Sequence, residues 1–231
     1  MGLTNKMIYQ QSNKTAGLRR IFGAALVLGC ALGTVTPAPA QFISSPPTPT
    51  LITPPEGNKA FLLGRATGTQ GYVCLPTADG ASWTVNNARP EATLFQSIFG
   101  QDFQIITHFL SPNEAPNDIA PRPLAFGNAT WQSSFDSSKV WAALFDNKMI
   151  KAGTHPSCPN EGSIACLLLQ NIGAKAGPAS GKFMAQVSFI QRLNTKGGSA
   201  PAEGCSVKAD VGKQALVPYT ADYWFFRAAG N

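Results

Sequence analysis

His108 is the side chain in this sequence that is best suited to chemistry. It lies in the apolar, β-branched segment Ile105–Phe109, where an imidazole could act as a general base or as a single metal ligand. A hydrolase would also need a carboxylate beside it, and Asp136 and Asp222 are the candidates. The chain has no G-x-S-x-G nucleophile elbow, so no motif supports this hypothesis. A histidine that packs at a sheet edge with one satisfied hydrogen bond is the alternative interpretation.

The two aspartates also have structural interpretations. Asp136 precedes Ser137 and Ser138, a pattern that is typical of an aspartate capping its own turn. Asp222 lies among aromatic residues of a predicted strand, where an unpaired buried charge would be unfavourable. Arg192, in another predicted strand, is its expected ion-pair partner.

Aromatic side chains and a polar cluster indicate a possible binding surface. Tryptophan and tyrosine rings can stack on sugars or line an apolar pocket, although core packing is their more frequent use. The polar cluster lies just before Gly197 and Gly198, so it could form the rim of a pocket or satisfy the backbone of a turn. The predicted binding residues are Trp83, Trp131, Arg192, Asn194, Tyr219 and Tyr223.

The cysteines predict two disulfides. Cys30 lies in a predicted targeting segment, which leaves four of the five cysteines in the mature chain. An even number in an exported protein is typical of a disulfide framework, and four cysteines allow three pairings. A bridge across the turn-rich segment between Cys158 and Cys166 leaves Cys74 to pair with Cys205. No metal or cofactor is predicted, because C-x-x-C spacing is lacking and histidines are few.

The first 40 residues have the features of a cleaved export signal. Basic residues precede an apolar segment, residues 21–35, which is too short to span a bilayer as a helix. An Ala-Pro-Ala cleavage site at 38–40 predicts a periplasmic or extracellular protein that begins at Gln41. An Arg-Arg pair at positions 19 and 20 leaves a twin-arginine route open, and a weak lipobox ending at Cys30 leaves lipid attachment open.

Most of the excess positive charge belongs to this signal. The chain has 18 Lys and Arg against 12 Asp and Glu, and four of the basic residues but none of the acidic ones precede position 41. The mature chain therefore has 14 basic and 12 acidic residues, a net charge of +2. Nucleic-acid binding needs clustered basic charge and is not predicted. No other apolar stretch is long enough to cross a membrane, and the sequence does not indicate an oligomeric state.

The mature chain is predicted to fold as a single β domain. Residues 41–57 contain five prolines among serines and threonines, a composition typical of a linker or an extended N-terminal arm. Residues 58–228 contain many short apolar segments with strand-like alternation, separated by glycine and proline. We expect an all-β fold, either an antiparallel sandwich or a partly closed barrel with long loops.

Several segments also resemble those of a known family. The longest, residues 189–226, consists of two strand-like segments joined by a Gly/Pro-rich connection that carries one cysteine. The others are Pro90-Glu91-Ala92, Thr107-His108-Phe109, residues 129–132, residues 136–141 and Leu167-Leu168-Leu169. In these segments the chain resembles the domain-of-unknown-function family numbered 3455, whose members are exported proteins of bacteria, fungi and plants. The resemblance implies a fold-sized unit and an exported location, and it implies no reaction.

Three functional hypotheses follow from these patterns. The leading one is a non-enzymatic envelope or extracellular module that binds a glycan or a small apolar ligand. The alternative is a hydrolase that uses His108 with Asp136 or Asp222, and the second alternative is a structural or interaction protein that uses the Pro-rich arm. Catalysis would require His108 and a carboxylate to converge in one pocket, whereas an interaction protein would need no pocket.

Overall fold

The computed structural model describes residues 42–112 and 127–230. The predicted export signal, including Cys30 and the expected cleavage site, lies outside the described residues. Within the described part of the chain almost all regular structure is β-strand. Two short 3-10 turns, Thr50–Ile52 and Lys208–Asp210, are the exceptions.

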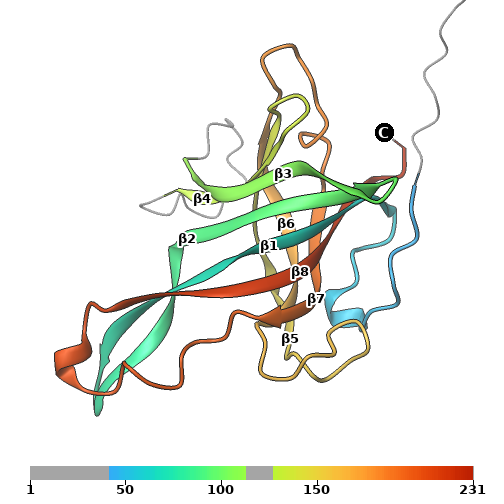
Figure 1. The fold of residues 1–231 in the computed structure, drawn as a ribbon. Helices are drawn as coiled ribbons and strands as arrows, with labels where there is room; N and C mark the ends of the chain where they lie inside the picture. The colour runs from blue at the N-terminus through green and yellow to red at the C-terminus, as the bar shows by residue number, and fades with distance from the viewer. Residues whose placement is uncertain (1–41, 113–126, 231) are drawn as a thin grey trace, which may run out of the picture. The chain divides into compact units, whose positions relative to one another are not determined.

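Eight antiparallel strands form one sheet that closes on itself (Figure 1). They are β1 (Asn58–Thr77), β2 (Gly80–Ile98), β3 (Gln101–Ser111), β4 (Asn128–Ser133), β5 (Lys139–Ile150), β6 (Cys166–Lys175), β7 (Phe189–Gly197) and β8 (Gln214–Ala228). Each strand pairs with the next one along the chain, and β8 pairs with β1, so the sheet is a closed barrel. The predicted antiparallel all-β fold is confirmed, with the barrel as its architecture.

Strand alternation decides which side chains enter the barrel. In β8 the side chains of Tyr219, Ala221, Tyr223 and Phe225 belong to the interior cluster, while Trp224 and Phe226 belong to an outer one. The pairing of β1 with β8 runs from Asn58 opposite Ala228 to Val73 opposite Gln214. This long ladder joins the two ends of the sheet and leaves no open edge between them.

One end of the barrel is filled by packed side chains. Ile190, Phe225 and Met184 are fully buried there. Met184 belongs to residues 182–187, which we call the plug segment and which form part of the connection between β6 and β7. An eight-stranded barrel has an interior that side chains can just fill or that can hold one small ligand. The packing at this end therefore leaves the opposite end as the place where a ligand could enter.

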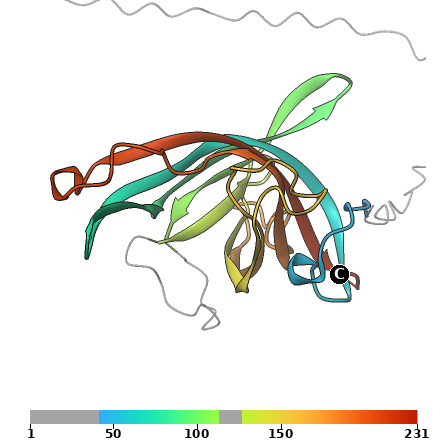
Figure 2. The ribbon, with the colours of Figure 1, turned by 90° about the horizontal axis from the view of Figure 1, so that it is seen from below.

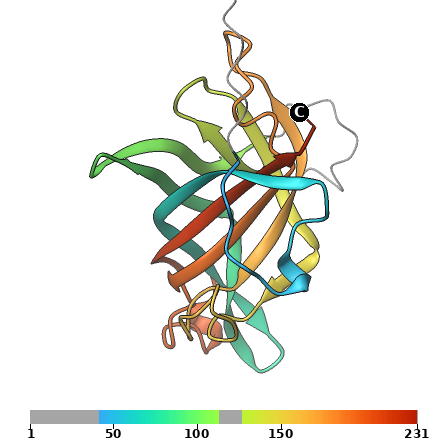
Figure 3. The same cartoon turned by 90° about the vertical axis from the view of Figure 1, so that its right-hand side faces the viewer.

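The segment that precedes β1 lies against the outer surface of the barrel (Figure 3). Ile52 is fully buried in a cluster with Leu193 and Phe226, and Gln191 Nε2 donates a hydrogen bond of 2.6 Å to the Ile52 carbonyl oxygen. The Ile43 amide also donates to the Ala60 carbonyl oxygen at 2.8 Å. The described part of the Pro-rich segment therefore packs against the barrel.

Both predicted disulfides are present. Cys74 bonds to Cys205, which joins β1 to the long connection between β7 and β8. Cys158 bonds to Cys166 and closes a loop at the start of β6. The first bridge lies in what we call the β1–β2 arm, residues 71–85, which extends beyond the rest of the barrel (Figure 2). It holds this hairpin against residues 198–213, which follow β7.

Candidate functional site

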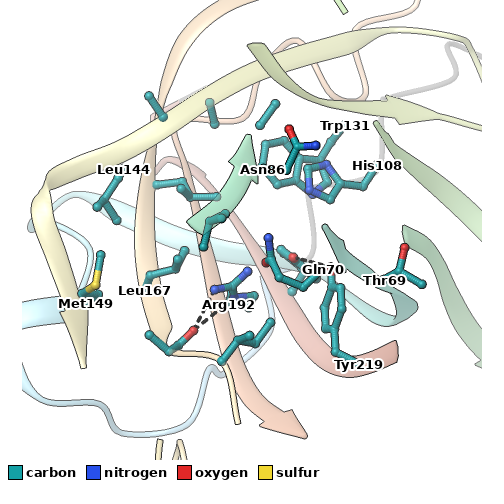
Figure 4. A pocket seen from close by; sticks show the side chains of 18 of the residues that line it. Thr69, Gln70, Asn86, His108, Trp131, Leu144, Met149, Leu167, Arg192 and Tyr219 are labelled. Atoms are coloured by element: carbon teal, nitrogen blue, oxygen red, sulfur yellow. Dashed lines mark hydrogen bonds between the residues drawn. The ribbon is translucent and has the colours of Figure 1, made fainter. Parts of the chain in front are cut away.

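The barrel contains a pocket of about 910 Å³, and no residue of the plug segment lines it. Figure 4 shows the side chains that form its walls. Its walls come from strands throughout the barrel and from the connections that precede β6 and follow β7. Val85, Asn86 and Ser199 line it near the base of the β1–β2 arm. Trp131 and Tyr223 belong to both the pocket wall and the packed interior cluster, so the core forms part of the pocket's inner surface.

One wall of the pocket is aliphatic. Leu144 and Met149 come from β5, and Leu167 and Leu169 come from the neighbouring β6. In β6, the side chain of Leu168 points outward into the cluster around the Cys158–Cys166 bridge. Successive side chains of a strand point to opposite faces, so Leu167 and Leu169 point into the barrel. This wall can hold an apolar group by burial alone, since it offers no side-chain hydrogen-bonding group.

The opposite wall is aromatic and polar. His108 and Trp131 are directly opposite each other in the pairing of β3 with β4, and their rings stack with centroids 4.0 Å apart. His108 Nδ1 lies 2.9 Å from the Thr130 carbonyl oxygen. A carbonyl oxygen only accepts, so Nδ1 carries the proton and Nε2 of the neutral ring carries none.

Burial lowers the pKa of His108 to about 4. The Thr130 hydrogen bond raises the pKa and the positive charge of Arg192 lowers it, but both effects are smaller than that of burial. The ring is therefore neutral near pH 7 and can accept a hydrogen bond at Nε2.

Arg192 brings a positive charge into the pocket from β7. It lies between the two walls, because β7 separates β6 from β8 in the strand order, and Figure 4 shows it between Leu167 and Tyr219. Its Nε and Nη2 atoms donate to the Ala165 carbonyl oxygen at 3.2 and 2.9 Å. None of the described residues that line the pocket is an aspartate or a glutamate.

Two tyrosine hydroxyls lie beside this charge. The Tyr219 and Tyr223 hydroxyl oxygens are 3.0 Å apart and share one hydrogen bond. Burial raises the pKa of Tyr219 well above 10, and Tyr223 adds to this rise while Arg192 opposes it. Tyr72, whose hydroxyl donates to the Gly198 carbonyl oxygen at 2.7 Å, completes this side of the pocket.

The structure brings together five of the residues that the sequence singled out. They are His108, Trp131, Arg192, Tyr219 and Tyr223, and all five line the pocket. Each occupies an inward position of its strand, so alternation is the common cause.

Trp83 and Asn194, the other two predicted binding residues, do not line this pocket. Trp83 is in the β1–β2 arm, and its indole nitrogen donates to the Glu203 carbonyl oxygen at 3.0 Å. Asn194 has a positive φ of 48° at an irregularity in the pairing of β7 with β8. Its side chain is exposed and donates to Asp222 Oδ2 at 3.3 Å.

The predicted ion pair between Asp222 and Arg192 is also wrong. In the register of β7 with β8, Arg192 is opposite Tyr223 and Asp222 is opposite Leu193. Neighbouring positions in a strand point to opposite faces, so Arg192 is inside the barrel while Asp222 is outside with Leu193. Asp222 is therefore also unable to serve as the carboxylate partner of His108.

Asp136 has the structural role that its turn pattern suggested, and it reaches further than that turn. It accepts hydrogen bonds from the Ser138 amide at 3.0 Å and the Ser138 hydroxyl at 2.7 Å. It also accepts one from the Phe183 amide at 2.9 Å, which fastens the plug segment to the β4–β5 turn. Asp136 does not line the pocket, so the structure does not bring its carboxylate into the pocket with His108.

Several pocket residues were not anticipated from the sequence. Thr69, Gln70 and Asn86 are ordinary polar residues of β1 and β2, and the aliphatic wall consists of leucines and a methionine that any β core could contain. Tyr72 differs from these residues, because the sequence already presents it as one of several aromatic residues that could form a binding platform. No group of three or more His, Cys, Asp or Glu side chains that could hold a metal occurs in residues 42–112 and 127–230.

Comparison with known proteins defines the family of this chain. The model of the family described as a protein of unknown function, DUF3455, matches residues 55–227. The chain belongs to this family. The matched region includes all eight strands except the last residue of β8, and thus the whole pocket. Comparisons with curated proteins and with solved structures found no match.

The disulfides bear on the compartment in which this member of the family folds. The two disulfides indicate a location outside the cytoplasm, because thiols are kept reduced inside it. Among the described residues, no helix has the length and apolar character needed to cross a bilayer.

Proposed function

We propose that this protein is a non-enzymatic binding protein that holds a small, largely apolar ligand inside its barrel. The observation that carries the proposal is the pocket of about 910 Å³, which lies within the range of small-molecule sites in proteins. Its aliphatic wall on β5 and β6 and its few polar groups are the composition expected of such a site. An eight-stranded barrel that closes at one end supplies a rigid container for it.

The lining favours an apolar ligand over a glycan. Sugar recognition uses exposed aromatic faces together with many polar groups, whereas Trp131 is about 1% exposed and already stacked on His108. Trp83, the other predicted platform, lies on the β1–β2 arm. The geometry supports a hydrolase less well, because neither Asp136 nor Asp222 joins His108 in the pocket.

The protein is proposed to act in the periplasm or outside the cell. Residues 1–40 serve as a cleaved signal, and residues 58–228 form the binding domain. N-terminal sequencing of the exported protein should identify Gln41 as its first residue. Recovery of a chain that starts at an acylated Cys30 would replace this proposal with a lipoprotein.

Ligand binding can be tested with a neutral, environment-sensitive probe. N-phenyl-1-naphthylamine should bind the oxidised protein with a saturable rise in fluorescence. Leu169→Trp and Leu167→Trp place a larger ring in the pocket. Each should weaken binding by about tenfold or more, because a steric change of even one methylene in an apolar binding pocket is worth roughly 1–3 kcal/mol.

The matched control is Leu75→Trp, which adds the same ring at a position 42% exposed on the β1–β2 arm. It should leave probe affinity unchanged, and urea unfolding should show that all variants fold. Equal affinity in the control and in the filled variants would place the probe on the outer surface and refute the proposal.

A further inference from the structure

We propose that the natural ligand is an amphipathic monocarboxylate whose carboxylate binds Arg192 and whose chain lies along the aliphatic wall of β5 and β6. This inference rests on the proposed function and names its ligand class. Three observations carry it, namely the free edge of the guanidinium, the spare donor of the tyrosine pair, and the position of Arg192 between two unlike walls.

The guanidinium presents one edge to the protein and one to the pocket. Nε and Nη2 both donate to a single acceptor, the Ala165 carbonyl oxygen. The edge formed by Nη1 and the second hydrogen of Nη2 has no acceptor among the described residues. Two parallel N–H groups in this arrangement match the two oxygens of a carboxylate, which is the usual bidentate partner of arginine.

Among the described residues that line the pocket, Arg192 also has no counter-charge. The side chain is half-buried, stays protonated as arginine does in proteins, and faces no carboxylate in the described pocket lining. A charge removed from water without a partner is unfavourable. An anion that enters the pocket restores this missing interaction, whereas a neutral ligand does not.

The tyrosine pair adds a second donor. Tyr219 and Tyr223 together have two hydroxyl protons, and their mutual hydrogen bond uses one of them. The other proton has no acceptor among the described residues. A carboxylate accepts only, so it suits this surplus of donors better than an alcohol or an amine, each of which brings a further donor.

The position of Arg192 sets the orientation of the ligand. Leu167 is directly opposite Arg192 in the pairing of β6 with β7, and Tyr223 is directly opposite it in the pairing of β7 with β8. Figure 4 shows Leu144, Met149 and Leu167 on one side of the guanidinium and Tyr219 and Thr69 on the other. A carboxylate at Arg192 therefore directs an attached chain onto the leucines and Met149.

Two probes that differ only in charge test the inference. Dansyl-labelled undecanoic acid and its methyl ester have the same chain and fluorophore, and both are titrated into the oxidised protein. The acid should bind about 10- to 100-fold more tightly than the ester, the range expected for hydrogen bonds to a charged group. Arg192→Met should remove this preference, because the acid loses its ionic partner and therefore loses far more affinity than the ester.

Arg65→Met is the matched control, since it removes one arginine from an exposed, outward position of β1. It should keep the full preference for the acid. Arg192→Lys, which keeps the charge but lacks the fork, should show an intermediate preference and provides a second variant if Arg192→Met unfolds.

The outcomes separate the two proposals. If acid and ester bind the wild-type protein equally well, the pocket binds ligands but the carboxylate assignment is wrong. If Arg192→Met weakens both probes to the same extent, Arg192 only supports the fold around Ala165 and the assignment is again wrong. If neither probe binds at all, the proposed function fails together with the inference.

Discussion

Replacing His108 should remove a pH-dependent part of the protein's stability. The ring is about 6% exposed, stacks on Trp131 and has Nδ1 bonded to the Thr130 carbonyl oxygen. Burial is the main reason that its pKa falls to about 4 in the folded protein. The hydrogen bond to Thr130 opposes the shift, and Arg192 adds to it.

The sign of the effect follows from proton binding. The unfolded chain takes up a proton at the ordinary pKa of 6.5, whereas the folded protein takes it up only near 4. Between these values acid stabilises the unfolded chain, so the free energy of unfolding falls as the pH drops below 6.5 and levels off below 4. A shift of this size corresponds to roughly 3 kcal/mol in total, of which about 2 kcal/mol is lost between about pH 7.5 and pH 5.

Urea unfolding of the oxidised protein at these two pH values measures the effect. His108→Phe keeps a ring on Trp131 and His108→Gln keeps a polar side chain, and neither ionises. Both variants should lose about 2 kcal/mol less stability than the wild type on acidification, whatever their stability at neutral pH. The reasoning is refuted if both variants show the wild-type loss, because the ionisation of His108 would then contribute nothing.

Three further predictions concern the fold. Asp136→Asn should lower stability at neutral pH by about 1–3 kcal/mol. Burial raises the pKa of Asp136, but its hydrogen bonds outweigh this effect and lower the pKa overall. The loss of stability in Asp136→Asn should therefore shrink as the pH falls through the pKa of Asp136 in the folded protein. Urea unfolding that shows the same loss at every pH would contradict this. Replacing Cys74 and Cys205 by alanine should lower stability by about 5 kcal/mol in the loop-entropy model. This is roughly twice the loss expected when the Cys158–Cys166 bridge is removed. Equal losses for the two bridges in thermal unfolding would contradict the prediction. Asp222→Asn should change the free energy of unfolding by less than about 1 kcal/mol. In a double-mutant cycle its effect and that of Arg192→Met should be additive. A coupling energy above about 1 kcal/mol would show that the two residues interact as an ion pair after all.

The sequence by itself determined the features that depend on local pattern and on counting. Alternation of apolar residues predicts strands because successive side chains in a strand point to opposite faces. The same alternation places the aromatic residues Tyr219, Tyr223 and Phe225 of β8 on one face, which is the inward face of the barrel. The even number of cysteines in the mature chain predicts two bridges, and the short spacing of Cys158 and Cys166 favours the observed pairing. The position of Asp136 before two serines predicts its capping role, since that contact spans only two residues.

Only the tertiary structure decided where these elements meet. Closure of the barrel depends on pairing β1 with β8 from opposite ends of the domain, and neither strand alone specifies its partner. Register placed Arg192 inside and Asp222 outside, because a shift of one residue exchanges the two faces of a strand. The contact of Asp136 with Phe183 likewise joins segments 47 residues apart. The pocket is therefore a property of long-range pairing, since each strand contributes only a few of its side chains to a space that exists once the ring has closed.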